Sequence, residues 1–399
     1  MNVKFEKYAQ LLLGSGVNLQ KDEYLIIEAP IETADFVREL SKAAFEKGAK
    51  DVIVYYSDPY FDLIRLNYAD EQLISEVKDY EKESLQYYLD KGAISILIES
   101  AYPFLYKDCK QSKNAALQTH TNDKRNVIRA MIASSGTKWL IASYPNKLWA
   151  KTLFPELPEE EAFDALCELL YDICRIDTQN DPNENWAKHL EEIAKYGNKL
   201  DEIGIDHLIF KNSIGTDLTI GLTEEARFGH GDTPRTTCAN IPTEEVCTTP
   251  DKYRVNGKVV ASKPLEVGGA IIENFGFTFK DGKVTDFYAE KNQDVLASLV
   301  NADEGSCYLG EVALVGYSTP ISLSNKVFYT TLLDENASCH LALGKGFYRG
   351  TDREEWEKAH ANFSKIHIDF MFGTKDMDII AVDREGKQHQ IFKNGDFVI

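Results

Sequence analysis

The early part of the chain carries the pattern that most restricts its fold. Two apolar runs, at residues 24–28 and 51–56, have the length and composition of buried strands. Between them, apolar residues recur at helical spacing from Phe36 to Phe45, and Gly48 follows as a C-terminal helix cap. A strand, a helix and a second strand in this order form a βαβ unit, whose strands are parallel.

The same alternation continues through the first half of the chain. Further helices are predicted near residues 71–90, 115–132, 159–175 and 184–203, and further strands at 93–98 and 138–143. We therefore predict that residues 1–190 form an α/β N-terminal domain with a mainly parallel sheet.

The second half of the chain has short β-type runs separated by turn signals. Asn-Gly and Asp-Gly pairs accept the positive φ angles of tight turns, so hairpins are predicted within residues 255–259 and 277–287 and a turn at Asn394-Gly395. A helix is predicted near residues 352–361. Residues 191–399 are thus predicted to form an α+β domain with an antiparallel sheet.

Charge and cysteine content exclude several classes of protein. The chain has 44 Lys and Arg against 64 Asp and Glu, and a net charge of −20 opposes binding to nucleic-acid phosphates. No apolar stretch approaches the roughly 20 residues of a membrane span, and the first residues lack the apolar core of a signal peptide. The 7 cysteines are odd in number, with no C-x-x-C pair, which favours a reducing cytoplasm. Cys247 and Cys339 are interpreted as small buried hydrophobic residues.

Common catalytic motifs are absent from the sequence. It has neither of the glycine-rich phosphate-binding loops, G-x-G-x-x-G and G-x-x-x-x-G-K-[ST], after its N-terminal strands. It also lacks the zinc-binding motif H-E-x-x-H and the nucleophile motif G-x-S-x-G. The remaining candidates for a functional site are acidic residues and histidines in the second half of the chain. Glu311 lies in an otherwise apolar strand, where a buried carboxylate needs a cation or strong donors. His367 and Asp369 are two residues apart, so in a strand both project from one face.

Further acids and a second imidazole occur in two other segments. Glu244 and Glu245 follow a proline in residues 240–246, and Glu335 and His340 lie in residues 334–344. Several carboxylates that converge without a Lys or Arg repel one another unless a divalent metal binds. The sequence therefore predicts a metal site in the second domain.

These segments resemble the thermophilic aminopeptidase family of metallopeptidases, the aminopeptidase T, aminopeptidase S and PepS group. The resemblance covers essentially the whole chain and is sharpest in four blocks, residues 240–246 (NIPTEEV), 309–315 (LGEVALV), 334–344 (DENASCHLALG) and 367–371 (HIDFM). Long blocks in a fixed order are far more specific than a short motif.

The resemblance implies a site with two divalent ions, zinc or cobalt, with manganese or magnesium as alternatives. The metal ligands that it implies are Glu245, Glu311, His340, His367 and Asp369, with Glu335 as a further candidate. It makes Glu311 the bridge between the ions. It also implies a homodimer that acts on peptides with a free N-terminus.

Three residues are assigned catalytic roles: Glu311, Glu244 and Tyr348. Glu244 or Glu335 is the candidate proton carrier. The family pattern has a tyrosine where this chain has Phe347. The adjacent Tyr348 is the candidate replacement that stabilises the oxyanion, and the alternative is that no residue takes this role. The alternative function is a catalytically impaired metal-binding homologue that acts as a peptide-binding or structural protein. A different hydrolase, such as an amidase or a carboxypeptidase, is a third reading.

Overall fold

The computed structural model describes residues 3–135, 137–229, 239–267, 269–347 and 353–399. The chain forms two compact units, one of Met1–Lys188 with Asp232–Pro242 and the other of His189–Gly231 with Thr243–Ile399. The break after Lys188 lies close to residue 190, the end of the predicted first domain. The short strand β7 (Asn240–Ile241) lies beyond residue 190 in the sequence but belongs to the first unit, because it pairs with a strand of that unit.

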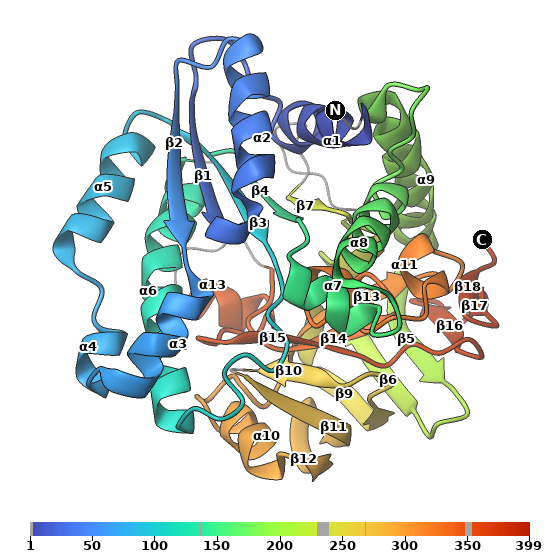
Figure 1. Ribbon diagram of the computed structural model, residues 1–399. Coiled ribbons are helices and arrows are strands. Elements are labelled where there is room, and N and C mark those ends of the chain that lie inside the picture. Colours follow the sequence, from blue (N-terminus) through green and yellow to red (C-terminus); the bar gives the residue numbers. More distant parts are fainter. Residues whose placement is uncertain (1–2, 136, 230–238, 268, 348–352) are drawn as a thin grey trace. The chain divides into compact units, whose positions relative to one another are not determined.

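The first unit is built on a parallel sheet with the strand order β2-β1-β3-β4-β7 (Figure 1). Each neighbouring pair in this sheet is parallel. The strands other than β7 are β1 (Tyr24–Pro30), β2 (Asp51–Ser57), β3 (Ile94–Glu99) and β4 (Trp139–Ser143). The apolar runs that predicted a βαβ unit are β1 and β2, and the mainly parallel sheet is confirmed.

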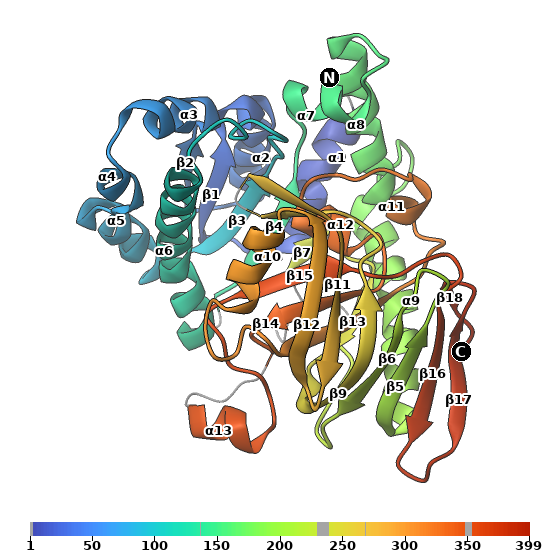
Figure 2. The ribbon, with the colours of Figure 1, turned by 90° about the horizontal axis from the view of Figure 1, so that it is seen from below.

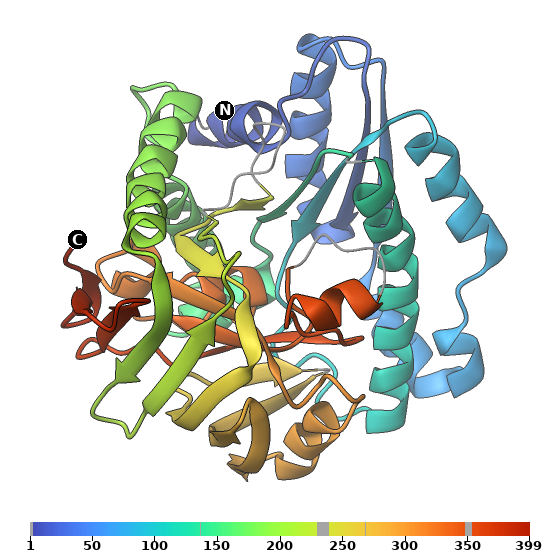
Figure 3. The same cartoon turned by 180° about the vertical axis from the view of Figure 1, so that it is seen from behind.

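Helices cover both faces of this sheet. Helix α2 lies on one face and α6 on the other, as the views from the front and from behind show (Figures 1 and 3). Phe36 of α2 stacks on Tyr8 and Tyr144, at ring-centroid distances of 5.1 and 4.4 Å. The helical segments of the unit are α1 (Val3–Leu11), the π-helical η1 (Leu12–Gly16), the 3-10 turn η2 (Ile31–Thr33), α2 (Ala34–Glu46), α3 (Pro59–Tyr68), α4 (Glu71–Ser75), α5 (Asp79–Leu89), α6 (Gln111–Ser135), α7 (Lys147–Leu153) and α8 (Glu159–Ile173).

The second unit contains a large antiparallel sheet with the strand order β10-β11-β9-β6-β5-β16-β17-β18, and β12 pairs with β11 (Figure 2). Its strands are β5 (Ile205–Lys211), β6 (Asp217–Leu222), β9 (Pro250–Val260), β10 (Leu265–Val267), β11 (Ala270–Lys280), β12 (Lys283–Lys291), β16 (Asp378–Asp383), β17 (Gln388–Lys393) and β18 (Asp396–Phe397). The turns at Asp281-Gly282 and Asn394-Gly395 are present, with positive φ at all four residues.

The predicted hairpin within residues 255–259 is wrong, because β9 runs without interruption through Asn256-Gly257. Gly257 has a φ of 120°, and a Cβ there would lie 2.2 Å from the carbonyl oxygen of Asp217 on β6. This glycine is therefore required by the close approach of two strands and not by a turn.

A third sheet, with the strand order β15-β14-β13-β8, also belongs to the second unit. Its strands are β8 (Glu245–Thr248), β13 (Leu309–Val315), β14 (His340–Gly344) and β15 (His367–Met371), and neighbouring pairs are antiparallel. One face contributes to the hydrophobic core of the unit through side chains from all four strands, namely Val246, Val312, Leu314, Leu341, Leu343 and Phe370. The predicted α+β fold with antiparallel pairing is confirmed.

The remaining helices are α9 (Pro182–Ile203), which spans the break between the units, α10 (Gln293–Val300), α11 (Pro320–Leu323), α12 (Thr331–Glu335) and α13 (Arg353–Lys358). Within the part of the chain that the structure describes, no helix is both long enough and apolar enough to cross a bilayer.

Candidate metal centre

The face of the third sheet opposite the core carries the predicted ligands. Strand register places Cys247, Ala313, His340 and Met371 in one row across the sheet, and Glu311, Ala342 and Asp369 in the next. Residues directly opposite one another in neighbouring strands point to the same face. Glu245 and His367 lie two residues along from members of these rows, so they share that face. The alternation that turns Val246 and Phe370 into the core therefore places the acids and imidazoles together on the other face.

A β-bulge in β13 aims Glu311 at this face. Leu309 pairs with Leu343, whereas Glu311 pairs with Ala342, so two residues of β13 oppose one residue of β14. Leu309 consequently enters the core although it is two residues from Glu311. Gly310 lies inside the bulge, and a Cβ there would lie 2.4 Å from the carbonyl oxygens of Gly344 and Lys345. Only glycine allows this approach.

The potential donor atoms converge in two groups that share Glu311. One group is Glu311, His340 and Asp369, and the other is Glu245, Cys247 and Glu311; within each group the ligand atoms lie within 4.8 Å of one another. His367 lies beside them, with its Nε2 3.2 Å from Glu311 Oε2 and 3.3 Å from Asp369 Oδ1. The structure thus brings together five of the residues that the sequence predicted as ligands.

Both imidazoles are held so that Nε2 points into the cluster. His340 Nδ1 lies 3.2 Å from the carbonyl oxygen of Ser338, and His367 Nδ1 lies 2.6 Å from that of Lys345. A carbonyl accepts only from a protonated nitrogen, so each Nδ1–H donates and leaves Nε2 to the cluster. This is the outer hydrogen bond typical of metal-binding histidines.

The charges of the cluster shift the pKa values of its members. Burial lowers the pKa of His340, but the hydrogen bond and charge of Glu245, whose Oε2 is 3.1 Å from Nε2, raise it to about 10. Burial also lowers the pKa of His367, and Asp369 and Glu311 raise it well above its usual value. Burial raises the pKa of Glu311, with Glu245 and Asp369 adding to the increase. The carboxylates therefore require positive charge beside them.

Glu335, at the end of α12, lies within the electrostatic field of the cluster. Burial raises its pKa, and the charges of Asp369 and Glu245 raise it further, to well above its usual value. The structure therefore brings this acid to the site, as a candidate for holding a metal or moving a proton.

Glu244 occupies a different environment from Glu245. Its Oε2 lies 3.6 Å from Nε2 of His189 on α9, and its N–H donates to Asn336 Oδ1 at 2.7 Å. The His189 ring also contacts the carbonyl oxygen of Thr243 at 2.8 Å. Glu244 is thus buried beside an imidazole that is not among the predicted ligands, and its role as proton carrier stays a prediction.

Phe347, at the position of the family tyrosine, lies at the edge of the cluster. Its ring centroid is 5.2 Å from that of His367, and its N–H donates to Thr249 Oγ1 at 2.8 Å. Tyr348, the predicted replacement, lies outside the described residues.

Cys247 is a member of the cluster that sequence reasoning missed. The sequence pattern favours a small hydrophobic role for it, yet its sulfur lies within 4.8 Å of carboxylate oxygens of Glu245 and Glu311. The signal that could have found it is its spacing of two residues from Glu245. The same interpretation is confirmed for Cys339, which is 1% exposed and belongs to the hydrophobic core.

The donor set fits divalent metal ions. Carboxylate oxygens and imidazole nitrogens are ligands of zinc and related ions. Oδ1 of Asp369 is buried and lies 3.3 Å from Nε2 of His367, but it accepts no hydrogen bond of good geometry among the described residues. A buried carboxylate oxygen needs positive charge beside it, and the two donor groups that share Glu311 offer places for a divalent cation.

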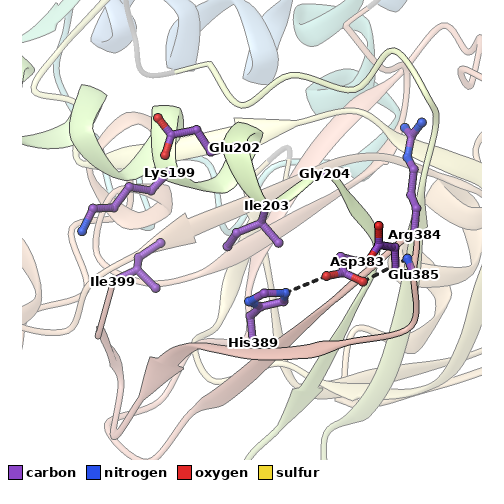
Figure 4. Close-up of a pocket in the computed structure, with 9 residues that line it drawn as sticks. All are labelled: Lys199, Glu202, Ile203, Gly204, Asp383, Arg384, Glu385, His389 and Ile399. Atoms are coloured by element: carbon purple, nitrogen blue, oxygen red, sulfur yellow. Dashed lines mark hydrogen bonds and ion pairs between the residues drawn. The ribbon is translucent and has the colours of Figure 1, made fainter.

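A separate hollow of the second unit has a different character (Figure 4). It is lined by residues of α9, the β16–β17 turn and the C-terminus, namely Lys199, Glu202, Ile203, Gly204, Asp383, Arg384, Glu385, His389 and Ile399. His389 Nε2 is 2.8 Å from Asp383 Oδ2, and Asp383 Oδ1 accepts from the N–H groups of Glu385 and Lys387 at 3.0 and 2.9 Å. These polar groups stabilise the turn itself, so we assign the hollow no role.

Comparison with known proteins agrees with this chemistry. Residues 1–397 match the sequence model described as thermophilic metalloprotease (M29). Aminopeptidase AmpS from Bacillus subtilis (strain 168) is 39% identical over 406 residues, which cover 99% of this chain and 98% of that protein. Aminopeptidase 2 from Geobacillus stearothermophilus is 36% identical over 405 residues, with 99% and 97% covered.

A solved structure shows the same fold. Wild-type AmpT from Thermus thermophilus superimposes with a TM-score of 0.91 at 32% sequence identity, and the match covers 99% of both chains.

Proposed function

This chain belongs to the thermophilic metalloprotease (M29) family, and we propose that it is a metal-dependent aminopeptidase that removes residues from the free N-termini of peptides. The family predicted from the sequence is thereby confirmed. The observation that carries the proposal is the sharing of Glu311 by two groups of donor atoms. A carboxylate has two oxygens, so one residue can serve two ions, which supports a two-metal mechanism.

In this proposal the ions are held by Glu245, Glu311, His340, His367 and Asp369. Bound divalent ions would supply the activation of water and the polarisation of the scissile carbonyl. The chain's own contribution is to fix the ligands on a rigid sheet, with each imidazole oriented through its Nδ1–H.

The proton carrier that we favour is Glu335. Glu335 lies in the electrostatic field of Glu245 and Asp369, so its carboxylate is placed to take a proton at the site and return it to the leaving amine. Glu244 remains the alternative carrier. Tyr348 is proposed to donate to the oxyanion of the tetrahedral species.

The charge of the site supports a preference for a free amine. Glu245, Glu311 and Asp369 face the same side of the third sheet, and Glu335 lies in their field. An N-terminal ammonium is attracted to such a surface, whereas an acetylated terminus has no charge to contribute. The relatives that bear aminopeptidase names also support this substrate class.

Zinc or cobalt is proposed as the working ion, with manganese or magnesium as alternatives. A homodimer in the cytoplasm is proposed from the family resemblance and from the content of free thiols. The alternative function, an impaired homologue that only binds peptides, gains no support from relatives whose names are those of enzymes.

The test is hydrolysis of paired aminoacyl anilides that differ only in N-acetylation. We expect the free-amine substrate to be cleaved, the acetylated one to resist, and a chelator to abolish the activity. Equal cleavage of both substrates would contradict an aminopeptidase, and cleavage of a substrate with a blocked N-terminus and a free carboxylate would favour a carboxypeptidase.

A further inference from the structure

We propose that Cys247 is a metal ligand, which binds through its sulfur together with the carboxylates of Glu245 and Glu311. The inference rests on the proposed function, because it assumes that the cluster holds a metal. It adds a soft donor to a site that otherwise has only oxygen and nitrogen donors.

The strand geometry aims Cys247 at the cluster. Cys247 is two residues from Glu245 on β8 and pairs in register with Ala313, which is two residues from Glu311 on β13. The three side chains therefore project from one face, and their donor atoms lie within 4.8 Å of one another. Because the side chain of Ala313 is small, it leaves room on this face of the sheet for the side chains of Cys247 and Glu311.

The backbone of Cys247 is fixed from both sides. On one side it lies in the ladder with β13, and on the other it exchanges two hydrogen bonds with Gly229, at 2.8 and 3.0 Å. A donor held on a backbone that is paired on both edges loses little conformational freedom when it binds a metal. The position is thus preorganised in the same way as those of the other ligands.

Cys339 provides a contrast within the same sheet. Its sulfur lies 3.4 Å from the N–H and 3.5 Å from the carbonyl oxygen of Val315, and its side chain belongs to the hydrophobic core. The sulfur of Cys247 instead lies within 4.8 Å of carboxylate oxygens of Glu245 and Glu311. The two cysteines therefore differ in surroundings, although neither is in a disulfide.

The chemistry of sulfur gives the proposal its consequence. A thiol must lose its proton to become a ligand, so uptake of the ion releases the S–H proton to solvent. A thiolate favours zinc and cobalt over magnesium and manganese, which prefer oxygen. Cys247 would therefore make this site selective for the softer ions.

The test uses the full-length protein loaded with Co²⁺, compared with Cys247→Ser and with the matched control Cys339→Ser. We expect a thiolate-to-cobalt charge-transfer band in the wild type and in Cys339→Ser, and its loss in Cys247→Ser. The serine variant should also bind zinc more weakly by at least roughly 10–100-fold, because the loss of a group that only orients a ligand already costs that much. A band that persists in Cys247→Ser would overturn the proposal.

A second measurement needs no variant. X-ray absorption of the zinc-loaded wild type should show a sulfur neighbour at about 2.3 Å from the zinc. Bound zinc with only oxygen and nitrogen neighbours would overturn the role of Cys247 and leave the proposed aminopeptidase intact. If the wild type binds neither ion, as equilibrium dialysis would reveal, both proposals fail.

Discussion

Glu311 of β13 and Asp369 of β15 are register partners of the same residue, Ala342 of β14, so they flank it on one face of the third sheet. Their side chains are 4% and 9% exposed. Two buried carboxylates so close together repel each other unless positive charge lies between them, and His367 Nε2 lies 3.2 Å from Glu311 Oε2 and 3.3 Å from Asp369 Oδ1.

Replacing Glu311 by Gln should nearly abolish turnover. The amide keeps the size of the side chain but has one oxygen and no charge, so it cannot serve two cations. A loss of several kcal/mol of transition-state stabilisation corresponds to a fall on the order of 10³-fold in kcat. Kinetics and metal content should be measured together, with the exposed Glu225→Gln as control. A Glu311→Gln enzyme with near-native activity would refute the shared-ligand role.

Chelation should inactivate the protein and also lower its Tm. A metal that binds only the folded state stabilises it by mass action, and its removal leaves only the imidazoles of His340 and His367 to offset the carboxylates. Activity and Tm should both recover when zinc or cobalt is restored. Activity that survives exhaustive dialysis against chelator would exclude metal-assisted hydrolysis.

This chain has Phe347 where the family pattern has a tyrosine, and this difference predicts the effects of substitutions at positions 347 and 348. If Tyr348 donates to the oxyanion, Tyr348→Phe should lower kcat by roughly 10²–10³ with little change in KM. Phe347→Tyr should then add little. Because the ring of Phe347 already lies beside His367, the opposite result, a silent Tyr348→Phe and a gain from Phe347→Tyr, would show that position 347 is the functional one.

Glycine at position 310 should be irreplaceable. An alanine Cβ would press on two carbonyl oxygens of the neighbouring strand, so Gly310→Ala should destabilise the fold by roughly 1–3 kcal/mol, as overpacking does. It should also lower metal content, because the bulge aims Glu311. Urea unfolding with metal analysis measures both effects. Gly229→Ala is the matched control, since the nearest atom to its Cβ is 3.8 Å away.

Asp303 should stabilise the entry into β15 in a pH-dependent way. Burial raises the pKa of Asp303, but hydrogen bonds from the Lys365 N–H and the Ser364 hydroxyl, at 2.6 and 2.8 Å, bring it below its usual value. The stability from this group is therefore present above the unfolded-state pKa of about 3.9 and is lost as the pH falls through the lower folded-state pKa.

Asp303→Asn should accordingly cost about 1 kcal/mol at pH 7, a value reduced for a partly exposed group. The difference from wild type should shrink as the pH falls through the lowered pKa of Asp303, because the aspartate then also becomes neutral. Urea unfolding across the pH range measures this, with the exposed Asp286→Asn as control. A difference that is constant with pH would contradict the ionic origin.

Local patterns in the sequence predicted much of the site, because period-two alternation in strands is a local property. His367 and Asp369 share a face as their spacing requires, and Glu311 is buried in an apolar strand as its neighbours indicate. The bulge at Gly310 was not predictable in this way. Alternation alone would place Leu309 on the same face as Glu311, and only pairing with β14 shows the shift.

Long-range pairing also explains the errors in the fold. Asn256-Gly257 has the composition of a turn, yet its glycine serves the contact with β6, which is far away in sequence. The strand β7 lies in the second half of the chain, and its parallel pairing with β4 cannot be read from its two residues alone. The cluster membership of Cys247 likewise depends on the register with β13.

The two faces of the third sheet have a consequence for the order of assembly. One face is part of the hydrophobic core, and burial of Val246, Leu314 and Phe370 there needs no ion. On the other face, the imidazolium groups of His340 and His367 already offset the charges of Glu245, Glu311 and Asp369. The polypeptide can thus complete its fold before it meets a metal, so the ion acquired in the cell would be set by supply and ligand preference after synthesis, not by folding.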